Sequence, residues 1–216
     1  MKKIVFVCLA VLSIVSCKKE NVQDVPVVTP AHVYKNYSNL KVGNYWIYER
    51  FNLDVDGNYS SLNQFDSLYV EKDTLINGVT YAKYITTNIL GPDYDPLYLR
   101  DSLHYTVDAS GTIYFSTENF TDILSQYYSI ASGDTLFYRH GMMTEDLVSC
   151  QVPAGVFVTK NFQFTWEVYI TAAAGQIRFS DRKMAEGVGL VYETLDFFAG
   201  DPNYKVRKLL RWGHNG

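Results

Sequence analysis

Three cysteines are the first residues whose chemistry the chain could use. Cys8 lies inside an apolar run, Cys17 ends that run, and Cys150 lies far from both. If the chain is cut before Cys17 and that thiol is modified, Cys150 has no partner left for an intrachain disulfide. Free cysteine is among the most buried residue types, so we expect Cys150 to be a buried strand thiol and not a nucleophile.

The N-terminal residues have the pattern of an export signal. Lys2 and Lys3 precede an apolar run over residues 4–15, which is shorter than the ~20 apolar residues of a transmembrane helix. The run ends in Ser13-Ile14-Val15-Ser16-Cys17, which resembles the lipobox of bacterial lipoproteins. The resemblance implies cleavage before Cys17 and acylation of that cysteine. Two or three acyl chains, such as palmitate, anchor a protein stably to a membrane.

The residues after the cysteine refine the expected location. Cys17-Lys18-Lys19-Glu20 resembles the start of lipoproteins from the Bacteroidetes group, in which acidic residues after a lysine direct export to the outer face of the outer membrane. Only one acidic residue follows here. We therefore expect an outer-membrane lipoprotein that faces either the cell surface or the periplasm. The predicted organisation is a signal peptide over 1–16, the lipidated Cys17 with a flexible tether over 17–36, and one domain over 37–216.

Composition limits the partners of this domain. The formal net charge is −4, which argues against nucleic acid, so the membrane is expected to be reached through the lipid anchor. The chain holds 18 tyrosines, and aromatic residues favour strands. Exposed Tyr and Trp side chains on a concave sheet could stack on sugars or line an apolar groove. The expected ligand is therefore a small apolar molecule or a carbohydrate.

Turn signals recur between alternating segments. Asp56-Gly57, Asn77-Gly78 and the segment 108–111 each predict a tight hairpin, and tight hairpins imply antiparallel pairing. Helical spacing over 119–128 predicts one short helix. Trp46, Trp166 and Trp212 are the expected core anchors. The predicted fold is mainly β, an antiparallel meander that forms a curved sheet, a half-barrel or a sandwich with at most one short helix.

A second resemblance covers most of residues 40–212. Six short motifs are similar, in type and order, to segments of small lipoproteins of the same bacterial group: Leu40–Trp46, Ile76–Tyr81, Leu99–Ser102, Gly133–Thr135, Val152–Phe157 and Glu186–Val191. The resemblance implies an antiparallel β domain, with a curved half-barrel as one form of it. It implies no activity.

The tripeptide Asp-Ser/Thr-Leu occurs at four places. It resembles the acceptor motif for O-linked glycans in the same bacterial group, which would place sugars on Ser67, Thr74, Ser102 and Thr135. In the structural interpretation, the Asp closes a turn and the next residues begin a strand. Both interpretations can hold together.

Metal-binding patterns are incomplete. Asp54, Asp56 and Asn58 match the first positions of a calcium loop, but Tyr59 stands where the sharp-turn glycine belongs, so we expect a plain hairpin turn. His140 with Met142-Met143 suggests copper, but these residues cannot all lie on one side of a strand. No metal and no cofactor is expected. The two glycines of Gly187-Val188-Gly189 predict a bulge or a close backbone approach.

Three functional hypotheses remain open. The first is a non-catalytic binding or structural domain held at a membrane. The second is a half-barrel that handles lipids or lipoproteins, and it requires an apolar cavity. The third is a hydrolase assembled in space, which requires a cleft where His and carboxylate side chains converge. The chain contains no Gly-Xaa-Ser-Xaa-Gly, His-Glu-Xaa-Xaa-His or phosphate-loop motif.

Overall fold

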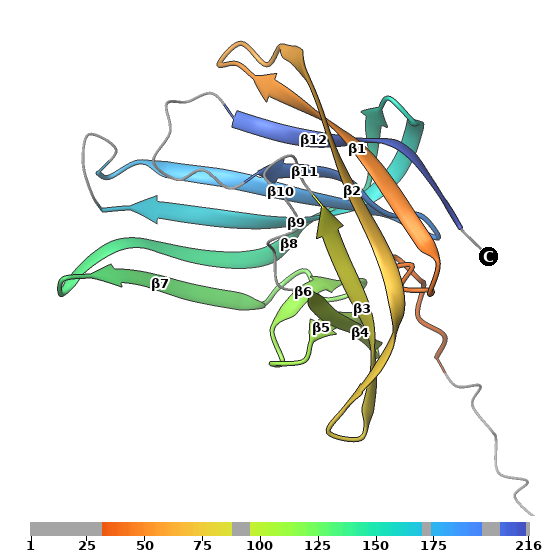
Figure 1. Cartoon of the computed structure of the whole chain (residues 1–216). Helices are drawn as coiled ribbons and strands as arrows, with labels where there is room; N and C mark the ends of the chain where they lie inside the picture. The colour runs from red at the N-terminus through yellow and green to blue at the C-terminus, as the bar shows by residue number, and fades with distance from the viewer. Residues whose placement is uncertain (1–31, 88–95, 170–173, 196–203, 215–216) are drawn as a thin grey trace, which may run out of the picture. The chain divides into compact units, whose positions relative to one another are not determined.

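Alternating aromatic and β-branched residues, interrupted by Asp, Asn and Gly turns, form a sheet (Figure 1). The computed structural model describes residues 32–87, 96–169, 174–195 and 204–214. Within those ranges there is no helix that could cross a membrane. The twelve strands are β1 (Asn44–Leu53), β2 (Tyr59–Ile76), β3 (Val79–Thr87), β4 (Leu97–Ser102), β5 (Tyr105–Asp108), β6 (Ile113–Ser116), β7 (Ser125–Ala131), β8 (Asp134–Val152), β9 (Gly155–Val168), β10 (Ile177–Ala185), β11 (Gly189–Leu195) and β12 (Tyr204–His214).

The predicted hairpins are confirmed, and local chemistry explains them. Asn77 and Gly78 both have positive φ, 50° and 80°, as the two-residue turn between β2 and β3 requires. In the β1–β2 turn, Asp54 Oδ1 accepts the backbone N–H of Asp56 at 3.0 Å and of Asn58 at 2.8 Å. Asp54 therefore closes a hairpin turn, as we predicted for this segment from its incomplete match to a calcium loop.

The twelve strands form one antiparallel sheet built from two meanders. The strand order is β6-β5-β4-β3-β2-β1-β12-β11-β10-β9-β8-β7, so the first and last strands of the sequence pair at its centre. The strands β6 and β7, which are consecutive in the chain, lie at opposite edges of the sheet. The predicted antiparallel meander with strong curvature is confirmed, because the strands of both meanders curve around one concave side (Figure 1).

The connection between the two edge strands corrects one prediction. The expected helix over 119–128 is wrong: Ser125–Ala131 is strand β7, paired with β8. Asn119 Oδ1 accepts the backbone N–H groups of Thr121 and Asp122, which fixes a turn in place of the first helical residues. The helical spacing failed because β7 pairs with β8 across the tight turn at Ser132 and Gly133, and helical periodicity over 119–128 does not report that pairing.

Large apolar side chains fill the concave side of the sheet. Trp46, Tyr48 and Phe162 are almost completely buried, and Trp166 is buried beside Phe137. Trp46 and Trp166 are thus core anchors as predicted, whereas Trp212 is 39% exposed and is not. Trp212 packs edge-on against Phe157, where the β8–β9 hairpin meets β12.

At the β10–β11 turn, Gly189 makes the expected close backbone approach. Gly187 and Gly189 have φ of 71° and 101°, and a Cβ on Gly189 would lie 3.1 Å from Trp46 Nε1. The indole N–H of Trp46 donates to Val188 O at 2.6 Å, so the turn closes directly over this ring.

Residues 33–216 cluster as one compact unit. The segment before β1 belongs to it, since Tyr37 is 2% exposed and packs against Phe115 of β6. The predicted signal peptide, Cys17 and most of the predicted tether lie outside the described residues.

Candidate functional site

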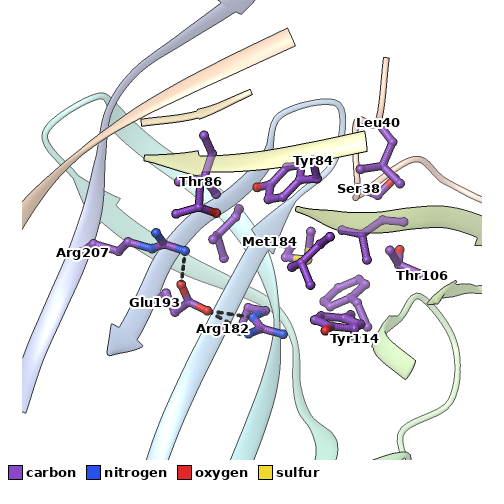
Figure 2. A pocket seen from close by; sticks show the side chains of 15 residues that line it. Ser38, Leu40, Tyr84, Thr86, Thr106, Tyr114, Arg182, Met184, Glu193 and Arg207 are labelled. Carbon is purple, nitrogen blue, oxygen red and sulfur yellow. Dashed lines mark hydrogen bonds and ion pairs between the residues drawn. The ribbon is translucent and has the colours of Figure 1, made fainter. Parts of the chain in front are cut away.

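An interior cavity of about 90 Å³ lies on the concave side of the sheet, between the two meanders (Figure 2). Most of its wall is apolar. Its polar lining comes from hydroxyl groups and from three charged residues, Arg182, Glu193 and Arg207. The fifteen lining residues are Ser38, Leu40, Leu68, Tyr84, Thr86, Leu97, Leu99, Thr106, Tyr114, Phe115, Arg182, Met184, Leu190, Glu193 and Arg207.

The three charged residues form a half-buried triad on neighbouring strands. Arg182 of β10 donates from Nε and Nη2 to Glu193 Oε1 at 3.0 and 2.9 Å. Arg207 Nη2 of β12 contacts the other carboxylate oxygen, so Glu193 lies between two guanidinium groups (Figure 2). The side chains of Glu193 and Arg207 are only 12% and 11% exposed.

The electrostatics of the triad keep it ionised. Burial alone would raise the pKa of Glu193, but the charges of Arg207 and Arg182 lower that pKa below its ordinary value. Burial likewise would lower the pKa of Arg207, and Glu193 raises it. The neighbouring phenol of Tyr84 has a raised pKa because of burial, so it stays a neutral hydroxyl.

A second ion pair joins this triad. Arg50 of β1 donates from Nε and Nη2 to the two oxygens of Asp66, both at 2.7 Å, and Asp66 is 1% exposed. Arg50 and Arg207 are paired across β1 and β12, and the charge of Asp66 also acts on Arg207. We call these five residues, Arg50, Asp66, Arg182, Glu193 and Arg207, the arginine network.

A larger cleft of about 680 Å³ lies between the β1–β2 and β8–β9 hairpins. The β8–β9 turn reaches across to β12, where Ala154 N–H donates to Leu209 O at 2.9 Å. The cleft is lined by Phe51, Leu53, Tyr59, Ser149, Cys150, Gln151, Val152, Pro153, Asp181, Lys183, Tyr192 and Lys208. Its volume falls within the range of about 300–1,000 Å³ that is typical of small-molecule sites.

Aromatic rings and a lysine form one wall of this cleft. Phe51 and Tyr59 are edge-on to each other with ring centroids 6.4 Å apart. Lys208 Nζ lies 3.0 Å from the Tyr59 ring centroid, and burial lowers the pKa of that lysine. Tyr59 is nevertheless 45% exposed, which leaves aromatic surface for a ligand.

Polar groups line the floor and the opposite wall. Asp181 Oδ1 accepts from the side-chain amides of Asn161 at 2.8 Å and Gln163 at 2.9 Å, which fixes the carboxylate. Lys183 pairs with Glu145 at 3.1 Å. Cys150 is buried as predicted, and burial raises the pKa of its thiol, so it is not an activated nucleophile.

One Ser–His contact resembles a catalytic pair but is part of a turn. His104 Nδ1 lies 3.0 Å from Ser116 Oγ. Ser116 is completely buried, and its Oγ accepts the backbone N–H groups of Glu118 and Asn119. In the described part of the chain, no three His, Cys, Asp or Glu side chains come together as metal ligands.

The predicted glycan acceptors lie in strands and at strand ends, all half-buried. Ser67 bonds Thr87 across β2 and β3, and Thr74 Oγ1 is buried without a partner. The preceding aspartates have structural roles at two of the motifs: Asp66 pairs with Arg50, and Asp101 accepts from Ser38 and Thr106 at 2.6 and 2.9 Å. Glycosylation of Ser67, Thr74, Ser102 and Thr135 stays a prediction.

Sequence reasoning missed both the arginine network and the cleft. The position of Arg182 could have pointed to the network. Arg182 lies on the same strand face as Ser180 and Met184, which are buried, and a charged residue on a buried face needs a partner. The same inference fails for Glu193 on β11, because the β10–β11 register shifts between Lys183 and Met184 and strict alternation no longer tells which residues face inward. The cleft depends on a contact between segments far apart in the chain, which no local pattern reports.

A solved structure shares the fold. A protein from Bacteroides fragilis that is inferred to be exported and has a YmcC-like fold is similar with a TM-score of 0.52 and 11% identity, covering 84% of this chain and 100% of the other. A protein from Parabacteroides distasonis that is inferred to be a lipoprotein has a TM-score of 0.42 and 10% identity, with the same coverage. No family pattern and no curated protein matches the sequence.

Proposed function

We propose that this chain is an outer-membrane lipoprotein whose β domain binds a ligand without chemically changing it. The lipobox-like segment ending at Cys17 and the Lys18-Lys19-Glu20 sequence support the anchor and its location. The shared fold with a protein inferred to be exported agrees with an envelope location. Proteinase treatment of intact cells tests the orientation: loss of the domain supports surface display, and full protection supports the periplasmic face.

The ligand of the proposed site is a carbohydrate held in the cleft between the β1–β2 and β8–β9 hairpins. The observation that carries this proposal is the mixed lining of a 680 Å³ cleft, where the rings of Phe51 and Tyr59 stand beside fixed polar groups such as Asp181. A sugar has apolar C–H faces and a rim of hydroxyls, and it therefore needs both kinds of contact. A purely apolar ligand would displace water from these polar groups without offering them new hydrogen bonds.

The competing lipid-handling hypothesis is less well supported. It requires a roomy apolar cavity, whereas the interior cavity has a volume of about 90 Å³ and carries three charged residues in its lining. A long acyl chain needs several times this volume. The hydrolase hypothesis lacks support as well, since the Ser116–His104 pair is buried in a turn.

A binding assay with matched variants tests the proposal. The full mature chain, in detergent micelles, is presented with a panel of oligosaccharides, and the affinity of the best ligand is measured by calorimetry. Loss of the Tyr59 ring in Tyr59→Ala is expected to weaken binding about two- to tenfold, because an aromatic contact contributes about 0.5–1.5 kcal/mol. Tyr128→Ala is the control: Tyr128 is a 57% exposed tyrosine stacked on Tyr138 and does not line the cleft.

Two outcomes would contradict the carbohydrate assignment. One is no saccharide binding at all by the intact chain. The other is equal weakening by Tyr59→Ala and Tyr128→Ala, which would place the contact outside the cleft.

A further inference from the structure

The arginine network holds more positive than negative charge. Three guanidinium groups face two carboxylates, which leaves one positive charge of this half-buried network unbalanced. Arg182, Glu193 and Arg207 are the charged residues that line the interior cavity. A further carboxylate, that of Asp101, accepts hydrogen bonds from the lining residues Ser38 and Thr106 and, among the described residues, none from these arginines. The surplus is notable in a chain whose formal net charge is −4.

An unbalanced buried charge is costly. Moving an ion out of water is unfavourable unless an opposite charge or hydrogen bonds compensate. Asp66 and Glu193 compensate the charges of two of the three arginines. The remaining charge predicts an anion close to the guanidinium groups.

One buried donor of the network also lacks an acceptor. Arg207 Nε is inaccessible to solvent and has no hydrogen-bond partner in the described part of the chain. A buried donor without an acceptor is destabilising, because it has given up its hydrogen bond to water. The same side chain lines the cavity, next to Glu193 and across from Tyr84 (Figure 2).

The rest of the cavity wall suits a short hydrocarbon group. Leu68, Leu97, Leu99, Met184 and Leu190 contribute apolar surface from both meanders. Ser38, Thr86, Thr106, Tyr84 and Tyr114 place hydroxyl groups among them. A volume of about 90 Å³ lies well below the range of about 300–1,000 Å³ of sites for drug-sized ligands, so it favours a small ligand.

We propose that the interior cavity binds a small monocarboxylate with a short alkyl tail, of the size of propionate. Its carboxylate neutralises the surplus charge of the arginine network, and its tail contacts the leucine wall. This site lies on the concave side of the sheet and shares no lining residue with the cleft, so the inference goes beyond the proposed function.

Thermal unfolding of the full mature chain in carboxylate-free buffer tests the proposal. Sodium propionate is expected to raise Tm saturably, by about 5 °C at concentrations far above Kd, because the ligand binds the folded state alone. Sodium chloride at equal ionic strength and propanol at equal concentration are the controls. Neither is expected to give a saturable rise, since one lacks the tail and the other lacks the charge.

Single substitutions test whether the Tm rise comes from binding in the interior cavity. Arg182→Met removes the surplus charge and is expected to weaken propionate binding at least tenfold. Arg211→Met removes one positive charge from an exposed position of β12 and is expected to leave the response unchanged. Leu99→Phe fills the cavity and is expected to abolish the response while it keeps the charges.

A direct measurement covers the case in which a variant does not fold. Carboxyl-¹³C-labelled propionate should show a bound NMR signal with the unmodified chain. The absence of both a bound signal and a saturable Tm rise would overturn the proposal, because the cavity would then hold water only. An unchanged response in both cavity variants would overturn it too. Tyr59→Ala should leave propionate binding intact, so failure of the cleft proposal is separable from failure of this one.

Discussion

At the residue scale, Glu193 is the side chain on which the interior charges depend. It holds Arg182 and Arg207 together through both carboxylate oxygens. Without its charge, two guanidinium groups remain buried side by side and repel each other. The cost of removing one partner of a buried pair exceeds the net value of the pair, because the other charge stays behind.

Glu193→Gln is therefore expected to destabilise the fold by about 3 kcal/mol or more. Urea denaturation at pH 7 measures the change. Glu186→Gln is the matched control, because Glu186 pairs with Lys35 on the surface, where both side chains are largely exposed. A midpoint for Glu193→Gln that equals that of Glu186→Gln would contradict the structural role assigned to the triad.

The lowered pKa of Glu193 gives a pH dependence with a definite sign. The Glu193 carboxylate binds a proton less tightly in the folded state than in the unfolded state, where a glutamate has a pKa of about 4.3. The contribution of Glu193 to stability is therefore present at neutral pH and lost as pH falls below about 4. The stability difference between the unmodified chain and Glu193→Gln is expected to shrink from pH 7 to pH 3. A difference that stays constant over this range would refute the prediction.

At the element scale, the β10–β11 turn shows how one close approach determines a sequence requirement. Gly189 lies against the Trp46 ring, with positive φ, whereas Gly187 has positive φ and open space around it. Trp46 in turn bonds the carbonyl of Val188 between them. The turn thus ties β1 to the β10–β11 hairpin.

Alanine substitutions separate backbone strain from steric contact at this turn. Gly187→Ala is expected to cost about 1 kcal/mol, the strain of a left-handed alanine. Gly189→Ala adds the contact with the indole ring and is expected to cost about 2–4 kcal/mol. Urea midpoints measure both, and the near-ultraviolet circular dichroism of Trp46 should change in Gly189→Ala alone. Equal effects of the two substitutions would show that the ring contact is unimportant.

Some of these structural elements could be predicted from the sequence, and others could not. The Asn77-Gly78 turn follows from local backbone preference, so the pattern identified it correctly. Strand β7 follows from pairing with β8, and the residues of 119–128 contain no local sign of that partner. Glu193 faces inward because of a register shift at Lys183 and Met184, and alternation alone cannot locate such a shift.

At the scale of the whole domain, strand order places two different sites on the sheet. The pairing of β1 with β12 brings Arg50 beside Arg207 and so assembles the arginine network from the two ends of the domain. The long β8–β9 hairpin reaches β12 and closes the cleft against the β1–β2 hairpin. Aromatic abundance suggested a surface that could stack on sugars, but the location of such a surface depended on these distant contacts.

The measurement that tests the central claim most directly is NMR mapping of the carbohydrate site. The ¹⁵N-labelled mature chain in micelles is titrated with the saccharide that binds best. Amide shifts are expected to concentrate in the segments that line the cleft, around Phe51–Tyr59, Ser149–Pro153 and Lys208. Shifts that concentrate at the exposed stack of Tyr128 and Tyr138, or that spread without a centre, would contradict the assignment of the cleft as the ligand site.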